Sequence, residues 1–548
     1  MIYIKNFVNL KIIYLTNKII LMKNLIFILL LSNSVFAQEL KTKFNWYNLD
    51  LENDGIRGMS TEKAYKELLK GRESKTVIVG VIDSGIDIKH EDLKDVIWKN
   101  TKEIANNGID DDKNGFIDDV FGWDFIGAAN GTDINQEQLE SVRILKTLSQ
   151  KFGENPKKKL IKKNKADYAL LQKVKSEIAD EKKEADQYMP MYKGMLEKII
   201  DAEAILSKAI GIKIITKEEV LALKEENFDK PVRQAKQLWL NINAMGATKA
   251  DIEEGVNHFN EQLEYNLNLD FDARKVINDD PKKLEYGNYG NNEVTGPDAM
   301  HGTHVAGIIG ANRKNNIGVK GVADNVKIMT IRCVPNGDER DKDVANAIKY
   351  AVDNGAQVIN MSFGKPYSPE KKWVDEAVKY AEVKGVLLIS AAGNDNLNVD
   401  ETIHYPSRIL ENGKVIKNWI TVGALNFEEG EDLPANFSNY GKKNVDVFAP
   451  GMAIYSTVPG SKYEEKQGTS MASPAVAGVA ALLKSYFPSL NASQIKNIIL
   501  ESVVKLNGTK VNVPGEKKIV DFSELCNTAG VVNVYNAVKM AIEITSKQ

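Results

Sequence analysis

The stretch that decides the fold is residues 77–82, VIVGVI, an almost continuous run of apolar and mostly β-branched residues. A strand that is apolar at every position is typical of a sheet covered on both faces, because both sets of side chains are buried. Further runs along the chain have the same character: 326–334, 357–363, 386–391, 420–424 and 445–449.

Helical stretches separate these runs. Residues 341–354 form an amphipathic stretch that ends at Gly355, a residue suited to closing a helix. A second helix is expected to begin at Ser368 as N-cap, with Pro369 in its first position, and to end at Gly385. Strands that alternate with helices predict an α/β fold, a doubly wound parallel sheet.

One long segment, residues 131–290, lacks this alternation and is rich in Lys and Glu. Between residues 171 and 209 its apolar side chains recur in steps of three and four, which predicts a long helix with one buried stripe. Glu181 breaks the stripe, and Pro190 is expected to kink the helix. We interpret the segment as a mainly helical insertion into the α/β domain.

Two more helices are expected within the insertion. Thr216 and Glu219 have the spacing of a capping box, and another helix is expected to start at Thr248. Two arrangements stay open. The helices form an antiparallel hairpin or small bundle, or they are a solvated charged face without a partner, as charge runs usually are.

Composition limits the classes of partner. The chain has 548 residues, 43% hydrophobic and 27% charged, which is ordinary for a soluble globular protein of more than one domain. Its net charge of -3 gives no reason to expect a nucleic-acid partner.

The N-terminal region has the features of an export signal. Lys23 is followed by the apolar run 25–31 and by Val35-Phe36-Ala37, which suits signal peptidase. The uncharged run 24–38 is shorter than the roughly 20 residues that span a membrane, so we expect cleavage and no stable membrane span. Residues 1–37 are thus interpreted as an upstream extension and signal peptide of an exported protein, periplasmic or secreted.

Two cysteines are present, Cys333 and Cys526. Export permits a disulfide, whereas the apolar run around Cys333 favours a free buried thiol, so their pairing stays open.

Two polar residues lie at the ends of apolar or small-residue stretches. Asp83 ends the first strand, where a carboxylate can orient an imidazole, although Asp-Ser-Gly is also an ordinary turn. His301 opens a stretch of small residues that predicts a closely packed helix. His304 lies three residues on, but no third ligand follows, so we expect it to be structural and not a metal ligand.

A third motif, GTSMASP, contains Ser470 and opens an apolar helix. A serine at a helix N-terminus has backbone N–H groups nearby and a favourable dipole, but it needs a base to become a nucleophile. The alternative is a simple N-cap, a role that Ser473 before Pro474 could also fill.

Together, Asp83, His301 and Ser470, in this order and these contexts, resemble the catalytic triad of the subtilisin-like serine peptidases. The resemblance covers about residues 77–143 and 287–486. It implies an endopeptidase that acts on proteins or peptides through an acyl-enzyme on Ser470, with His301 as general base and Asp83 as the orienting carboxylate. The other residues that it implies are the oxyanion-hole Asn394 and, for substrate binding, Ser362, Phe363, Gly364 and Gly393.

This chain departs from compact members of that family in two ways. The insertion separates Asp83 from His301, and the lead segment 38–75 is short for an inhibitory prodomain. The catalytic domain is therefore expected in two parts, 76–130 and 291–548. We expect the insertion to restrict access for bulky substrates. The rival functions are a non-catalytic scaffold, which would normally have lost a triad residue, and a metallopeptidase, for which no ligand set is found.

An acidic loop precedes the insertion and predicts a structural Ca²⁺. Oxygen-bearing residues recur at every second position around a glycine, as in the first part of an EF-hand loop, but the closing position holds Phe and not Glu. The alternative is an Asn/Asp-rich surface turn. The candidate ligands are Asp110, Asp112, Asn114, Phe116 and Asp118.

Overall fold

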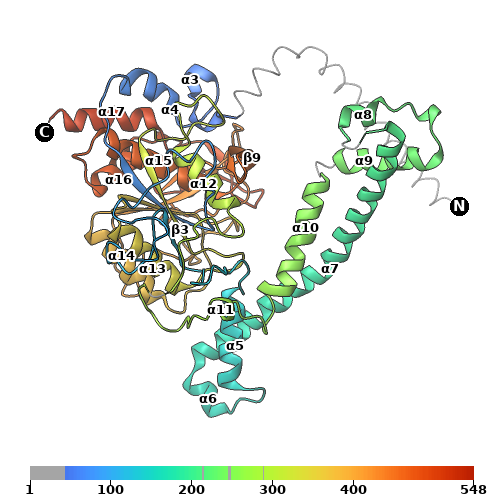
Figure 1. Ribbon diagram of the computed structural model, residues 1–548, viewed down its shortest axis with the longest axis horizontal. Coiled ribbons are helices and arrows are strands. Elements are labelled where there is room, and N and C mark those ends of the chain that lie inside the picture. The colour runs from blue at the N-terminus through green and yellow to red at the C-terminus, as the bar shows by residue number, and fades with distance from the viewer. Residues whose placement is uncertain (1–43, 213–214, 245–247, 288, 548) are drawn as a thin grey trace.

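The computed structural model describes residues 44–212, 215–244, 248–287 and 289–547. An α/β body carries a helical arm that projects from one side (Figure 1). The signal peptide and upstream extension expected at residues 1–37 lie outside the described residues. Within the described ranges, no helix has both the length and the apolar character that crossing a bilayer requires.

The body is built on a nine-stranded sheet, which confirms the predicted doubly wound α/β class. Neighbouring strands are parallel except for the antiparallel pair of β10 and β13 at one edge. In spatial order the strands are β10 (Val504–Lys505), β13 (Gly530–Val531), β7 (Val447–Pro450), β6 (Trp419–Leu425), β5 (Leu387–Ala391), β4 (Val358–Met361), β1 (Val77–Asp83), β3 (Val326–Arg332) and β2 (Gly122–Asp124).

Helices cover both faces of the sheet. One face packs against α12 (Met300–Gly310), α15 (Thr469–Tyr486), α16 (Ala492–Glu501) and α17 (Val534–Thr545), and the other against α13 (Asp341–Asp353) and α14 (Lys371–Val383). In β1, Val79 and Val81 belong to the first layer and Ile82 to the second. This two-sided burial is why the strand is apolar throughout. The expected start of α14 at Ser368 is wrong, because the Ser368 hydroxyl donates to Asp341 Oδ1 and the helix begins at Lys371.

The described part of the lead segment, residues 44–75, belongs to the same core. Its short helices are η1 (Trp46–Asn48), α3 (Leu51–Asp54), α4 (Thr61–Ala64) and η2 (Tyr65–Leu69). Trp46 and Tyr47 are buried in the first layer, and the Tyr47 hydroxyl donates to the Lys320 carbonyl at 2.9 Å. Two small hairpins complete the body: β8 (Ile454–Val458) with β9 (Lys462–Lys466), and β11 (Lys510–Asn512) with β12 (Ile519–Asp521), followed by η5 (Phe522–Glu524). Cys333 and Cys526 are free and buried in separate apolar clusters.

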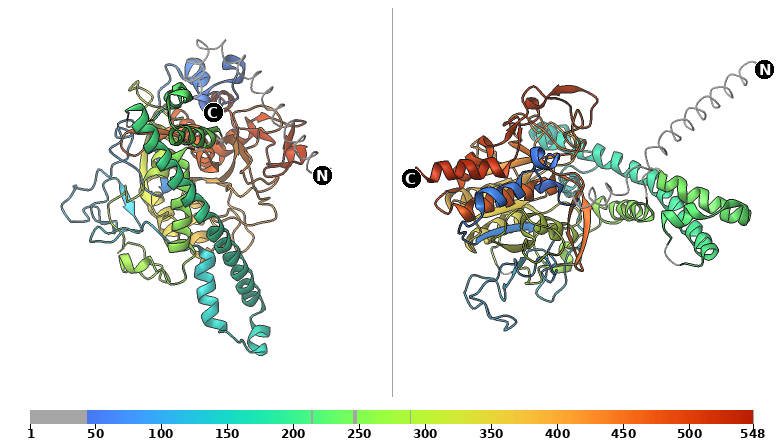
Figure 2. Two further views of the ribbon diagram at one scale, coloured as in Figure 1. Left: turned by 90° about the vertical axis from the view of Figure 1, so that its right-hand side faces the viewer. Right: turned by 90° about the horizontal axis from the view of Figure 1, so that it is seen from above.

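The arm consists of helices from the insertion, and Figure 2 shows how far it extends from the body. Thr216 and Thr248 each cap a helix in a capping box. The long helix α7 continues through Pro190. The helices of the insertion are α5 (Glu140–Phe152), α6 (Lys158–Lys163), α7 (Lys165–Ile210), α8 (Lys217–Ala222), η3 (Glu225–Asn227), α9 (Lys230–Ala244), α10 (Lys249–Glu261), η4 (Gln262–Asn266) and α11 (Arg274–Ile277).

The stripe of α7 is buried by partner helices, so the structure has the hairpin and not the lone solvated helix. Near the body, Leu171, Val174 and Ile178 pack with α5. Toward the tip, Ile199 and Leu206 pack with α8, α9 and α10 in a separate cluster. The arm therefore has a base and a tip with distinct apolar cores.

Buried ion pairs fix the base to the body. Arg143 and Lys365 both contact Glu140, at 2.5 and 2.8 Å, and Arg274 pairs with Asp343 of α13. Burial alone would raise the pKa of Glu140, but the charges of Arg143 and Lys365 lower it well below its usual range. Removing Arg274 would leave the buried Asp343 carboxylate without its cation, and breaking such a buried pair typically costs about 3–5 kcal/mol.

Candidate active site

Asp83 and His301 meet where β1 ends and α12 begins. His301 Nδ1 donates to Asp83 Oδ1 at 2.7 Å, and the Ser84 backbone N–H donates to the same oxygen at 2.8 Å. Gly302 makes this approach possible, since a Cβ at that position would lie 2.1 Å from the Gly85 carbonyl oxygen. The small-residue motif after the histidine therefore brings the helix close to the strand end.

The surroundings of His301 favour its protonated form. Burial lowers the pKa of the imidazole, but the negative charge of Asp83, its hydrogen bond and the charge of Asp298 outweigh that effect, and the pKa is raised above its usual value. Asp83 is buried, whereas 39% of the His301 side chain is exposed. One face of the imidazole is therefore open to an incoming molecule.

Ser470 lies in the first turn of α15, beside the end of β4. Its hydroxyl donates to the Ser362 carbonyl at 3.1 Å, and the Ser362 hydroxyl donates to the Ser470 carbonyl at 3.0 Å. Gly468 is the N-cap, with a φ of 148° that favours glycine. Ser473 is not the cap, because it is buried and donates to Asn360 Oδ1 at 2.6 Å.

Asn394 faces the same turn from the loop after β5. Its Oδ1 accepts hydrogen bonds from the backbone N–H and the hydroxyl of Thr469, at 2.9 and 2.8 Å, which fixes the amide plane. A Cβ on Gly468 would lie 3.4 Å from Asn394 Nδ2 and 3.5 Å from Ser470 N. Two N–H donors thus border one small space that the glycine leaves open.

Two of the four expected substrate-binding residues, Gly364 and Gly393, lie beside a histidine, His404, that the sequence did not reveal. Ser362 and Phe363 are buried at the end of β4. A Cβ on Gly364 would lie 2.0 Å from His404 Nε2, and a Cβ on Gly393 would lie 3.1 Å from His404 Cε1. The imidazole therefore fills the space between the two glycines. It lies in a loop with no periodic pattern, so no local signal pointed to it.

His304 has the structural surroundings that we expected. It is buried, and its Nε2 donates to the carbonyls of Ile454 and Glu464 at 3.0 and 3.1 Å. Burial lowers its pKa to about 3, so the ring is neutral at ordinary pH.

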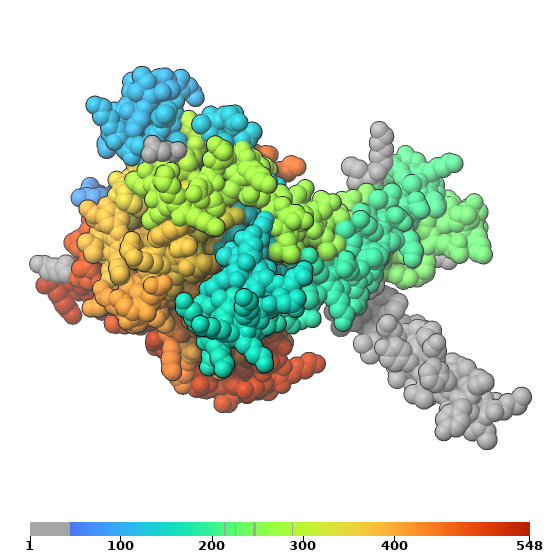
Figure 3. Space-filling model, turned by 90° about the horizontal axis from the view of Figure 1, so that it is seen from below, coloured from blue at the N-terminus to red at the C-terminus, as the bar shows by residue number. Residues whose placement is uncertain are grey.

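The insertion contributes directly to the site. A cavity of about 740 Å³ opens beside the Asp83–His301 pair and extends to Ser362 and Lys466. Its opposite wall is one face of α10, formed by Ala250, Glu253, Glu254, Asn257, His258 and Glu261. The space-filling view shows the arm joined to the body by its base and projecting beyond it (Figure 3).

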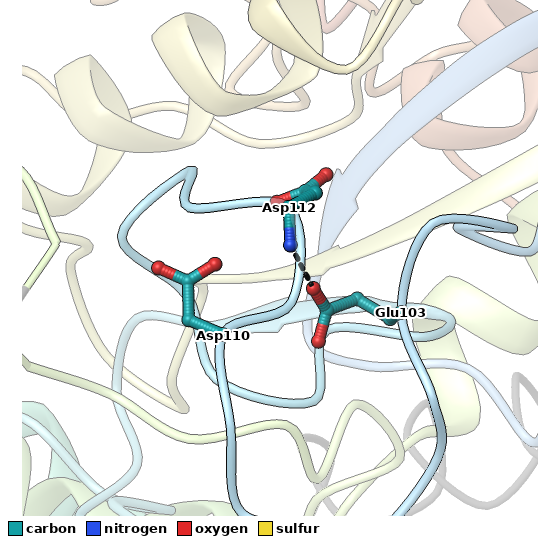
Figure 4. A group of neighbouring side chains, drawn as sticks. All are labelled: Glu103, Asp110 and Asp112. Carbon is teal, nitrogen blue, oxygen red and sulfur yellow. Dashed lines mark hydrogen bonds between the residues drawn. The ribbon is translucent and has the colours of Figure 1, made fainter.

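The acidic loop between β1 and β2 gathers three carboxylates. Oxygens of Glu103, Asp110 and Asp112 lie within 4.8 Å of one another (Figure 4). Glu103 also accepts the Asp112 backbone N–H at 3.0 Å. Oxygen ligands in this arrangement suit a hard cation such as Ca²⁺. Glu103 lies outside the alternating pattern, so the sequence analysis missed it.

The other three candidate ligands have different contacts. Asn114 Nδ2 donates to Asp119 Oδ2, and the Asp118 carboxylate accepts two backbone N–H groups, those of Asn107 and Gly108. The Phe116 ring is fully buried in an aromatic cluster that fixes the loop to the body.

The subtilase family model matches residues 74–520, and the chain belongs to this family. It is 42% identical over 210 residues to a thermophilic serine proteinase of Bacillus sp. (strain AK1), a match that covers 38% of this chain and 48% of that one. It is 38% identical over 208 residues to subtilisin DY of Bacillus licheniformis, covering 38% and 71%. The chain thus spans about half the length of the first relative.

Among solved structures, one match is to proteases from Pseudoalteromonas arctica PAMC 21717. That match has 28% sequence identity and a TM-score of 0.38, and it covers 47% of this chain and 81% of the other.

Proposed function

We propose that the protein is a serine endopeptidase that hydrolyses protein or peptide substrates. The observation that carries the proposal is the Asp83–His301 pair at the cavity that also contains Ser362, the partner of Ser470. A carboxylate, an imidazole and a serine at a helix N-terminus are the groups that acyl transfer needs. Family membership supports the same conclusion.

In the proposed mechanism, the Ser470 hydroxyl rotates from the Ser362 carbonyl toward His301 Nε2 and attacks the scissile carbonyl carbon. His301 takes the hydroxyl proton and then gives it to the leaving amine, which frees the first product and leaves the acyl-enzyme. Asp83 holds Nδ1–H and stabilises the imidazolium. Water then attacks the acyl group, again with His301 as base.

The developing oxyanion would occupy the space above Gly468. Asn394 Nδ2 and Ser470 N both border that space, and the Asn394 amide is held in place by Thr469 before any substrate arrives. Donors that are already oriented stabilise the transition state without reorganisation.

The substrate would pair as an extended strand with the backbone at Ser362–Gly364 and beside Gly393. Its P1 side chain, on the acyl side of the scissile bond, would then face His404. Because the imidazole fills the space between Gly364 and Gly393, we propose that a short P1 side chain is accepted better than a bulky one.

We further propose that the arm restricts access to the site. The polar face of α10 forms the wall opposite His301, so a folded protein has to bring its loop between two surfaces. A short peptide meets less hindrance.

Two further proposals concern export and calcium. The segment 23–37 supports export to the periplasm or the medium. The group Glu103, Asp110 and Asp112 would hold one Ca²⁺, which would stabilise the acidic loop by binding the folded state only.

The test of the function is active-site labelling with a fluorophosphonate on the purified chain. The label should map to Ser470, and Ser470→Ala should lose both labelling and peptide hydrolysis without a change in melting temperature. Ser473→Ala, in the next turn of the same helix, should keep both. A label on another serine, or hydrolysis that survives Ser470→Ala, contradicts the proposal.

A further inference from the structure

Helix α10 turns its polar face toward the candidate active site. Ile252 is buried in the tip cluster with Ile199 of α7, and Val256 is buried one turn later. The residues that line the cavity follow helical spacing on another face: 250, 253, 254, 257, 258 and 261. An amphipathic helix usually turns such a face to open solvent, whereas here it faces Asp83 and His301.

Contacts at the C-terminal end and in the middle of α10 hold this face in place. At its C-terminal end, the Glu261 carboxylate accepts hydrogen bonds from Gln136 Nε2 at 2.9 Å and Asn336 Nδ2 at 2.6 Å. In its middle, Gly255 packs so closely on Tyr192 of α7 that a Cβ there would lie 2.3 Å from the ring. The helix is therefore a positioned wall of the cavity.

The charge in this cavity is unbalanced. Its two strong cations are already paired, Arg332 with Asp124 at 2.6 Å and Lys466 with Glu464 at 3.1 Å. The carboxylates of Glu254 and Asp298 are on exposed residues that line the cavity.

A buried acceptor adds to the negative character. Asp83 is 2% exposed, and its Oδ2, the oxygen that does not face His301, has no hydrogen-bond partner among the described residues. Glu253 also lines the wall, with the Lys249 ammonium at 3.8 Å. A cationic group in the cavity would therefore meet several carboxylates at once.

The extended conformation of a bound substrate determines which of its side chains would face the α10 wall. Successive side chains of an extended strand point to opposite sides. If the P1 side chain faces Gly364 and Gly393, the P2 side chain faces the other way, toward His301 and the α10 wall. We infer that this acid-lined cavity binds a lysine or arginine side chain at P2, so that the insertion sets a preference for basic residues. The inference rests on the proposed peptidase function.

The test compares two fluorogenic peptides that differ only at P2, Lys against norleucine, which have similar length but different charge. The measurement is the ratio of their kcat/KM values at low ionic strength. For the unchanged chain the ratio should be about tenfold in favour of Lys and should shrink with added salt. The double variant Glu253→Gln with Glu254→Gln should bring it close to one.

The matched control is Glu197→Gln with Glu218→Gln, two exposed carboxylates elsewhere on the arm, which should leave the ratio as it was. An unchanged ratio in the α10 double variant, or no preference for Lys in the unchanged chain, overturns the inference while the peptidase function stands. Hydrolysis of neither peptide overturns both.

Discussion

The helix that carries Ser470 and the long helix of the arm differ in how they are held. In α15, 15 of 18 residues are buried, and the helix packs along the sheet. In α7, 7 of 46 residues are buried, along one stripe. Helix α10 lies against α7 and shares that thin support. A core packed on all sides can hold reacting groups in one geometry. An arm whose helices are buried along one stripe only can be altered without disturbing those groups. We therefore expect the body to determine the chemistry and the arm to determine substrate selection.

A change in the body should then affect every substrate alike. Asp83→Asn keeps the shape but removes the charge beside His301, and the wrong imidazole tautomer should lower kcat by about 10⁴-fold. The loss should be equal for a short peptide and a folded protein. The control is Asp87→Asn, which lies outside the Asp83–His301 pair and should keep most of the activity.

The same variant tests the electrostatics of His301. The imidazole acts as a base only when neutral, so activity falls as the pH drops below its pKa, which Asp83 raises. Without that charge, burial lowers the pKa and only the smaller effect of Asp298 opposes it, so the acid limb of the residual kcat/KM profile should move to lower pH. An acid limb that stays in place means that Asp83 does not set this pKa.

A smaller loss of activity is expected when one of the N–H donors that border the proposed oxyanion space is removed. Asn394→Ala removes one of the two N–H donors and should lower kcat by about 10²–10³-fold with little change in KM. Asn412→Ala, in an exposed turn, is the control. A loss confined to large substrates would show that Asn394 acts in access and not in the chemical step.

The smallest expected effect concerns the stability of the body. Ca²⁺ at 100 times its Kd should stabilise the folded chain by about 2.7 kcal/mol, seen as a higher melting temperature that chelator reverses. Asp112→Ala should abolish the dependence on calcium. Asp111→Ala changes a neighbouring carboxylate outside the group and should keep it. If calcium does not change the melting temperature of the unchanged chain, the proposed calcium site is contradicted.

The body and the arm differ in how much of their structure could be predicted from the sequence. The strands of the body were predictable because burial on both faces leaves continuous apolar runs such as residues 77–82. The position of Glu103 and the contact of His404 with two glycines depend on how loops close, and neither leaves a periodic signal. For the arm, the stripe of α7 was visible, but a polar helical face does not reveal whether it meets solvent or a cavity, as α10 shows.

The arrangement of the arm also dictates how it can be removed. A deletion of the whole insertion would remove Arg274 from the buried Asp343 and Glu140 from the buried Lys365, which would keep only its ion pair with Asp341. The tip can be removed alone, because Gly255 and Tyr192 are in contact and a short Gly/Ser linker can replace residues 193–254. This cut takes out the separate tip cluster and leaves the base pairs intact.

The most direct test of the account is the activity of this tip-deleted chain, measured with a small fluorophosphonate, a short neutral peptide and a folded protein. We expect an unchanged labelling rate and unchanged peptide hydrolysis, together with faster cleavage of the folded protein. A parallel loss of all three activities would contradict the account, since it would mean that the arm supports the catalytic geometry itself.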